Sequence, residues 1–277
     1  MGRGPKNGIR KKFIIYPIVV ILYIIILLPV FWILLTSFKP TKLTNVPEAV
    51  IFNPTLNQYD FVVTRTNLWS VLGSTIFIDI STAVLTTFLA SLAAFPLTRY
   101  HFFGKDSVAF WFLSFWMGPP VAFGIPLFVI FKLFGLFDTY LALILCYTTF
   151  NLPLAIWIVM SFYQEIPPEI GEAAELDGAN PLQIYFRIYL PLAIPGLIAT
   201  IILVFIFAWN EFLYALILAG TRVKTITLLV SSYWTMAGVL IGPMAATITI
   251  SIIPALLACW FIQEYLVRGL TFGAISR

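Results

Sequence analysis

The sequence has very few charged residues for its length. Only 10% of its 277 residues are Asp, Glu, Lys or Arg, whereas 61% are hydrophobic, and the mean hydropathy is +0.99. A soluble globular domain carries about 25% charged residues and roughly half apolar ones. A chain this apolar cannot cover its own surface in water, so lipid must be the solvent for most of it. This excludes a soluble multidomain protein.

Groups that carry chemistry in other proteins are also scarce. The single histidine, His101, excludes a metal site built from several histidines. The two cysteines, Cys146 and Cys259, lie inside apolar runs without a CxxC neighbour, so we expect them to be packing residues. No Walker-type phosphate loop occurs, because Gly104-Lys105-Asp106 lacks both the upstream glycine and the hydroxyl residue. We therefore expect no catalytic residue, metal ligand or ATP site in this chain.

Six charge-poor stretches are long enough to cross a bilayer, which takes about 20 helical residues. The polar segment 38–69 is interpreted as a loop with one short amphipathic helix. Residues 225–263 carry no charge over 39 residues and could hold two short spans. Because Ser231 to Thr235 is too polar and aromatic for the bilayer centre, an interfacial or re-entrant segment followed by one span fits better. The predicted fold is an all-α membrane protein with six transmembrane helices, at Phe13–Ser37, Gly73–Leu97, Ser107–Phe131, Thr139–Tyr163, Pro191–Leu218 and Val239–Gln263.

Five basic residues stand directly before the first predicted span. A nucleic-acid-binding tail and a signal peptide are the alternatives, but the 23 uncharged residues at 13–35 exceed the apolar core of a signal peptide. We predict a retained first helix with its basic end in the cytoplasm, and six spans then place both termini there. This organisation gives a basic tail at 1–12, a membrane domain at 13–264 and a carboxyl-terminal tail at 265–277. The basic residues are Arg3, Lys6, Arg10, Lys11 and Lys12.

The predicted cytoplasmic loop 164–190 contains a short helix with sequence signals at both ends. Pro168 suits a helix start, and Glu169 in the first turn complements the helix dipole. Gly178 supplies a left-handed stop after about three turns. A solvated helix, acidic only for solubility, is the alternative to a docking element. One face at helical spacing carries Ile170, Ala173, Ala174 and Asp177.

A longer pattern surrounds this helix. Glu172-Ala173-Ala174 is followed after three residues by Gly178, and after nine more by Ile188-x-Leu190-Pro191. A chance match to these seven positions is on the order of 10⁻⁸ per window. The pattern resembles the EAA loop in membrane subunits of binding-protein-dependent ABC importers. Asn57-Gln58-Tyr59 and Trp209-Asn210-Glu211-Phe212 look like the carbohydrate-uptake branch, and the chain is most similar to the shorter of two partner permeases of the maltose-transporter type.

The resemblance implies a mechanical role. The short helix is expected to insert into a cleft on a separate ATPase subunit and to move as a rigid body when two ATPases close on ATP. It implies a second permease, two ATPase copies that bind ATP and Mg, an extracytoplasmic solute-binding protein and a prokaryotic inner membrane, with no cofactor in this chain and no nucleic acid. The expected coupling residues are Glu172, Ala173, Ala174, Asp177, Gly178 and Ala179.

The solute route is predicted from breaks and polar groups inside the spans. Irregular backbone at membrane depth lines a cavity or is buried in protein, so Gly118 and Pro119 indicate that the third span borders the route. A kink used only for packing is the alternative. Ionisable groups within spans are expected to face the bundle interior, as for Asp79. A cluster on the fifth span could line a sugar path: Trp209, Asn210, Glu211 and Tyr214.

Two other classes compete with the importer. A secondary transporter driven by an ion gradient needs buried acids as coupling sites and, typically, an internal repeat. It leaves the EAA spacing unexplained. A membrane enzyme needs paired carboxylates or a metal constellation, whereas the clustered acids here lie on a short alanine-rich helix without a basic or histidine partner. The importer is therefore the predicted class.

Overall fold

The computed structural model describes the backbone of residues 6–274 and the side chains of residues 15–261. The chain divides into two compact units. The first comprises the chain up to Leu68 together with residues 232–251. Within its described part lie α1 (Lys6–Ser37), η1 (Thr41–Leu43), α2 (Asn57–Arg65), the hairpin of β1 (Trp234–Thr235) and β2 (Gly238–Val239), and the start of α13 (Ile241–Ala274).

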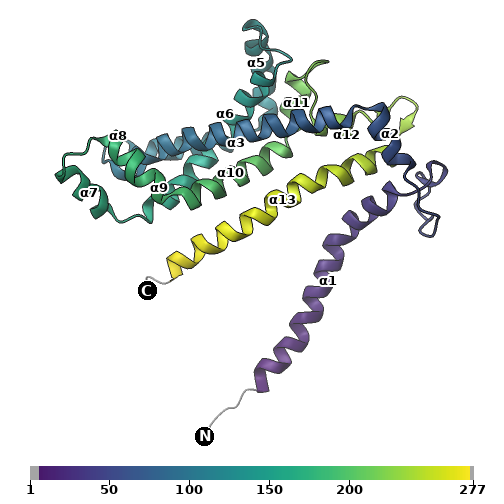
Figure 1. The fold of residues 1–277 in the computed structure, drawn as a ribbon, viewed down its shortest axis with the longest axis horizontal. Coiled ribbons are helices and arrows are strands. Elements are labelled where there is room, and N and C mark those ends of the chain that lie inside the picture. Colours follow the sequence, from purple (N-terminus) through teal and green to yellow (C-terminus); the bar gives the residue numbers. More distant parts are fainter. Residues whose placement is uncertain (1–5, 275–277) are drawn as a thin grey trace. The chain divides into compact units, whose positions relative to one another are not determined.

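The second unit comprises residues 69–231 and the rest of α13. Its central helix is α6 (Tyr140–Gln164), which packs against α4, α10 and α11 (Figure 1). The other helices are α3 (Leu68–Arg99), α4 (Lys105–Trp116), α5 (Pro120–Leu133), α7 (Pro168–Leu176), α8 (Pro181–Ile184), η2 (Tyr185–Tyr189), α9 (Leu190–Leu192), α10 (Ile194–Trp209), α11 (Leu213–Leu218) and α12 (Ile226–Ser231).

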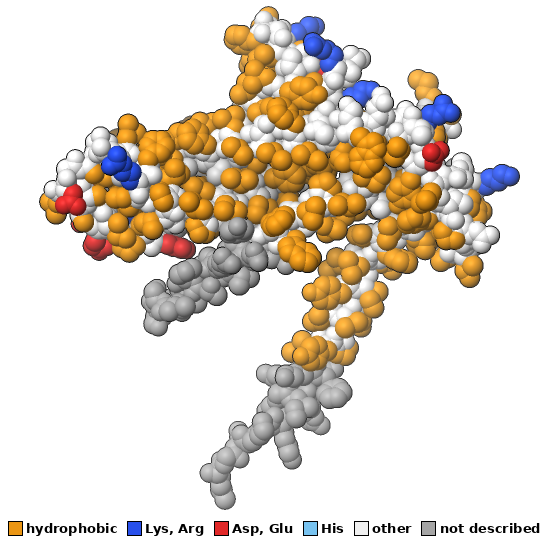
Figure 2. Space-filling view, in the orientation of Figure 1, with side chains coloured by type: hydrophobic (Ala, Val, Ile, Leu, Met, Phe, Trp, Pro, Cys, Tyr) orange, Lys and Arg blue, Asp and Glu red, His pale blue; other side chains and the backbone are white. Residues whose placement is uncertain are grey.

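Four helices are long and apolar enough to span a membrane by themselves: α1, α3, α6 and α13. Two helix pairs qualify only as bent spans, with a bend of 90° between α4 and α5 and of 74° between the segment 181–192 and α10. Counting each pair as one span gives the six predicted from the sequence. In Figure 2 hydrophobic side chains cover most of the visible face, whereas charged ones lie mainly at its left, upper and right margins. Such a surface suits contact with lipid.

Two predicted spans are not continuous helices. The third is interrupted between Trp116 and Pro120, which confirms the predicted break at Gly118-Pro119, although α5 continues through Pro126 without a second break. The fifth was predicted as Pro191–Leu218, and this is wrong. Its helix ends at Trp209, and α11 is separate. The Asn210 side chain bonds to the carbonyl of Ile206 at 2.7 Å, so it competes with the backbone for the last turn.

The first and last helices are longer than the predicted spans. Helix α1 begins at Lys6 and α13 continues to Ala274, so both helices enter the predicted tails. The side chains of the basic cluster, together with residues 1–5 and 275–277, lie outside the described residues. The short helix predicted in the polar segment 38–69 is confirmed as α2. Between residues 225 and 240 the chain forms α12 and the hairpin, and a single span follows, as predicted.

Candidate coupling site and solute route

The short helix of the 164–190 loop forms where the sequence predicts it. Helix α7 has Pro168 at its start and Glu169 in its first turn. Gly178 takes a left-handed φ of 83°, and the N–H of Ala179 reaches back to the carbonyl of Ala174 at 2.9 Å. The next helix begins at once, because Asn180 and Gln183 form a reciprocal capping box. Helix α7 therefore begins at a proline, ends at a left-handed glycine and lies at one end of the second unit (Figure 1).

The predicted coupling residues divide between two sides of α7. Glu172, Ala173, Asp177 and Gly178 are exposed. Ala174 and Ala179 are half-buried and pack against a buried cluster of their own subunit. The exposed side is thus the one open to another protein, whereas Ala174 seats the helix on its own bundle.

One large apolar residue on α7 escaped the sequence analysis. Leu176, in the last turn of the helix, is 91% exposed. Ile170, in the first turn, is 42% exposed. The available signal was a single large apolar residue between Glu175 and Asp177, with only small alanines at strand or helix spacing before it. An exposed leucine beside two acids and a small alanine is a surface suited to protein contact.

The residues predicted for the solute route do not form one open surface. Trp209 is buried and stacks on Phe205 with ring centroids 5.6 Å apart. Tyr214 is buried against Phe150, with ring centroids 4.3 Å apart. Asn210 and Pro119 are exposed, and Gly118 is half-buried. The sugar path therefore stays a prediction, with Pro119 and Asn210 as its exposed members.

Glu211 lies in the gap between α10 and α11. Its carboxylate accepts a hydrogen bond from the N–H of Tyr214 at 3.0 Å, which satisfies a free donor at the start of α11. Thr227 donates to the carbonyl of Glu211 at 2.9 Å. The Tyr214 hydroxyl in turn donates to the carbonyl of Pro120 at 3.3 Å, directly after the break at Gly118 and Pro119. Glu211 therefore caps α11 and contacts α12, while Tyr214 links α11 to the start of α5.

Asp79 faces the interior of the helix bundle, as predicted. It is 1% exposed on α3. Within the described part of the chain neither of its carboxylate oxygens has a hydrogen-bond partner.

Asp138 forms a clamp that the sequence analysis did not single out. Its carboxylate accepts hydrogen bonds from four successive backbone N–H groups, of residues 220 to 223, at 2.7–3.0 Å. Burial alone would raise the pKa of Asp138, but these donors favour the charged form and bring its pKa below the ordinary value. A Cβ at Gly220 would lie 2.7 Å from the carboxylate, so only glycine fits there. The clamp ties the loop before α6 to the loop before α12.

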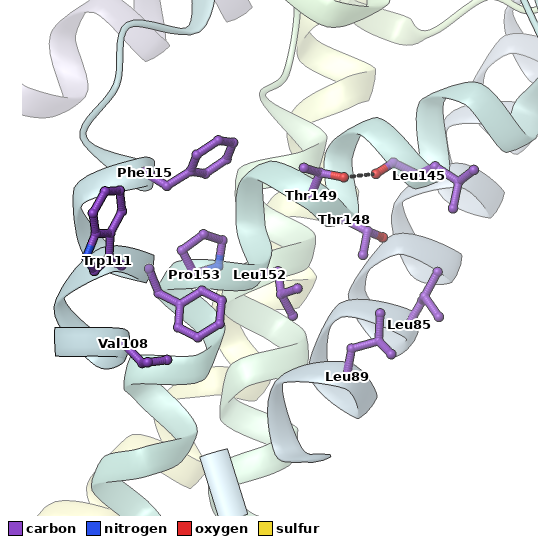
Figure 3. Close-up of a pocket in the computed structure, with 11 residues that line it drawn as sticks. Leu85, Leu89, Val108, Trp111, Phe115, Leu145, Thr148, Thr149, Leu152 and Pro153 are labelled. Carbon is purple, nitrogen blue, oxygen red and sulfur yellow. Dashed lines mark hydrogen bonds between the residues drawn. The ribbon is translucent and has the colours of Figure 1, made fainter. Parts of the chain in front are cut away.

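An apolar cavity of about 570 Å³ lies between α3, α4 and α6 (Figure 3). Its polar lining side chains are two threonines, and the Thr149 hydroxyl is already bonded to the carbonyl of Leu145 at 2.8 Å. Sites for hydroxylated solutes present several convergent polar groups. This cavity is therefore unsuited to a sugar.

Four apolar helices long enough to cross a bilayer, together with two bent helix pairs, characterise a multi-pass membrane protein. The chain belongs to the family described as the binding-protein-dependent transport system inner membrane component, whose pattern matches residues 86–272. Proteins of this family are permease subunits of ABC importers, as the sequence resemblance implied.

Two relatives match nearly the whole chain. The trehalose transport system permease protein SugB of Mycobacterium tuberculosis is 36% identical over 90% of this chain and 92% of its own length. The trehalose/maltose transport system permease protein MalG of Thermococcus litoralis is 31% identical over 98% and 99%. A chain of a bacterial ABC transporter involved in alginate import has the same fold, with a TM-score of 0.77 at 20% identity over 96% of this chain and 99% of that one.

Proposed function

We propose that this chain is one of two permease subunits of an ATP-driven importer for a sugar or a related polyol. The observation that supports this best is α7, a helix that begins at Pro168 and stops before the left-handed Gly178. It carries the EAA spacing and exposes Ala173 and Leu176. The substrate class is supported by SugB and MalG, which are transport proteins for trehalose and for trehalose or maltose. The clustered acids on α7 then serve a protein interface.

The partners follow from the same proposal. A second permease completes the translocation path, and two ATPase subunits bind ATP and Mg and each receive one coupling helix. A solute-binding protein delivers the sugar from outside, in keeping with the alginate transporter solved in complex with its solute-bound periplasmic protein. The residues that face the ATPase in this proposal are exposed, on α7 or directly after it: Glu172, Ala173, Leu176, Asp177 and Gly178. Ala174 and Ala179 pack the helix against its own subunit.

Transport by the purified complex tests this function. Partners that copurify with the tagged chain from native membranes are reconstituted in proteoliposomes, and uptake of radiolabelled trehalose and maltose is measured. We expect uptake to require ATP on the side of the membrane that carries the ATPase and the solute-binding protein on the opposite side. Uptake should persist when ionophores collapse ion gradients. Uptake that follows an ion gradient without ATP would instead identify a secondary transporter.

The orientation is proposed from the basic cluster before α1 and the number of spans: both termini and α7 are cytoplasmic, and the loop before α2 is outside. Gln164→Cys and Ile51→Cys, in a background with Cys146→Ser and Cys259→Ser, place labels at exposed positions on the two sides, since Ile51 is 97% exposed. An impermeant thiol reagent added to intact cells is expected to label Ile51→Cys alone. Labelling of both variants from the same side contradicts this topology.

A further inference from the structure

One face of α3 holds a set of contacts with the loop that carries α7. Ser91, Phe95 and Arg99 lie four residues apart, on one helix face, at the end of α3 that approaches α7 in Figure 1. The Ser91 hydroxyl is hydrogen-bonded to the hydroxyls of Tyr163 at 2.6 Å and Tyr185 at 2.8 Å. These contacts join α3 to the last turn of α6 and to η2.

Arg99 contacts two further segments of the chain. Its guanidinium donates to the backbone carbonyls of Tyr163 and Ile166. Tyr163 lies in the last turn of α6 and Ile166 directly after it, where carbonyls have spare acceptor capacity and the helix dipole favours a positive charge. The same guanidinium lies 4.4 Å from the ring centroid of Tyr189, within range of a cation–π contact. Arg99 thus connects the end of α6 to η2.

Tyr189 carries this connection to the coupling helix. It is 2% exposed, and its hydroxyl would lie 2.6 Å from a Cβ placed on Gly171. Gly171 is the fully buried residue of α7, so the ring rests directly on the helix backbone. Tyr100, directly after α3, and Ala174 of α7 pack against the same buried cluster, so α7 also lies close to the end of α3.

We propose that Arg99 is a positioning residue for the coupling helix: by holding Tyr189 against Gly171, it makes α7, η2 and the inner ends of α3 and α6 move as one body. The proposal rests on the proposed coupling function of α7. Displacement of α7 by the ATPases then reaches the membrane bundle through Tyr189 and Arg99. Without Arg99, α7 still docks on an ATPase but moves independently of α3 and α6.

Arg99→Gln in the reconstituted complex tests this role. Arg187→Gln is the matched control, because Arg187 is exposed on η2 and the charge change is the same. We expect Arg99→Gln to assemble and to hydrolyse ATP, while the sugar transported per ATP falls about tenfold, as suits the loss of charge-assisted hydrogen bonds and a cation–π contact. Arg187→Gln should keep the wild-type ratio.

A distance measurement reads the position of α7 directly. Spin labels on Glu175→Cys in α7 and Ser161→Cys in α6, both exposed positions, are introduced into an otherwise cysteine-free complex. The distance distribution should be narrow in the wild-type background and with Arg187→Gln, and broad with Arg99→Gln. A merely local loss of stability in α3 would leave this distribution narrow.

A second pair of variants tests the contact at the other end of the connection. Gly171→Ala should lower transport per ATP because its methyl group meets the Tyr189 hydroxyl. Tyr189→Phe keeps the ring over Arg99 and removes that hydroxyl, so the double variant Gly171→Ala/Tyr189→Phe should regain most of the loss. If Arg99→Gln fails to assemble, this pair of variants still tests the contact between Tyr189 and Gly171. Absence of rescue in the double variant would then overturn the proposal.

The outcomes separate this proposal from the coupling function itself. Wild-type transport per ATP and a narrow distance distribution in Arg99→Gln overturn the positioning role, even where Ala173→Trp still blocks uptake. If Ala173→Trp also leaves uptake intact, the coupling function of α7 fails as well.

Discussion

A single methyl group added at Gly196 is expected to force α10 away from α6 and to lower the free energy of unfolding by about 1–3 kcal/mol or more. A Cβ at this position would lie 2.2 Å from Cγ of Phe162 and 2.5–2.6 Å from both Cδ atoms. Cγ moves only if the whole Phe162 ring leaves its χ1 rotamer, so either the ring must give up its packing between the helices or the two backbones must separate. Gly196→Ala should unfold at a lower temperature in detergent, measured by size-exclusion chromatography of heated samples.

Gly73→Ala is the matched control for Gly196→Ala. Gly73 is also in a helix, but it is exposed and no atom lies within 4 Å of its added Cβ. This variant should be neutral or slightly more stable, because alanine favours helix over glycine by up to about 1 kcal/mol. In a Phe162→Ala background, Gly196→Ala should cost far less than in the wild type. Equal costs in both backgrounds, or wild-type stability of Gly196→Ala, would remove the ring contact as the cause.

The coupling helix could be predicted residue by residue because its signals are local. Pro168 at the start, Glu169 in the first turn and the left-handed Gly178 each act within a few residues of their own position. The structure has all three where the sequence placed them. Which side of the helix faces its own bundle depends on Tyr189, which lies 18 residues beyond Gly171. The pattern therefore could not separate Ala173 from Ala174.

The spans could be counted from composition, but their bends could not all be placed. The break at Gly118-Pro119 was visible because proline lacks the N–H that a helix interior needs. The end of α10 at Trp209 depends instead on side-chain bonds of Asn210 and Glu211 to backbone groups. Asp138 is a similar case, since its four donors lie more than 80 residues away in the chain. Such contacts leave no periodic signal in the sequence.

Ala173→Trp is expected to abolish sugar uptake by preventing α7 from entering the ATPase. Ala173 is exposed, so an indole at this position does not disturb the packing of this chain. A docked helix has no room for it, and overpacking of a close interface is costly. Ala174 differs, because it is half-buried against its own subunit, and Ala174→Trp should therefore unfold the complex at a lower temperature. Tryptophan at these two neighbouring positions is thus expected to cause two distinct defects: loss of uptake at Ala173 and loss of thermal stability at Ala174.

Leu176→Glu tests the same interface without added bulk. Leu176 is 91% exposed in this chain, and its burial on docking should contribute about 1.5–3 kcal/mol. A glutamate there adds an unpaired charge among the acids of α7 and should weaken retention of the ATPase during purification. His101→Trp, an exposed position in the loop after α3, is the control for a new indole on the proposed cytoplasmic side. Purified Ala173→Trp and Leu176→Glu complexes should lose sugar-stimulated ATP hydrolysis, whereas His101→Trp should keep it. Normal stimulation in the first two would make α7 a simple connector between α6 and α10.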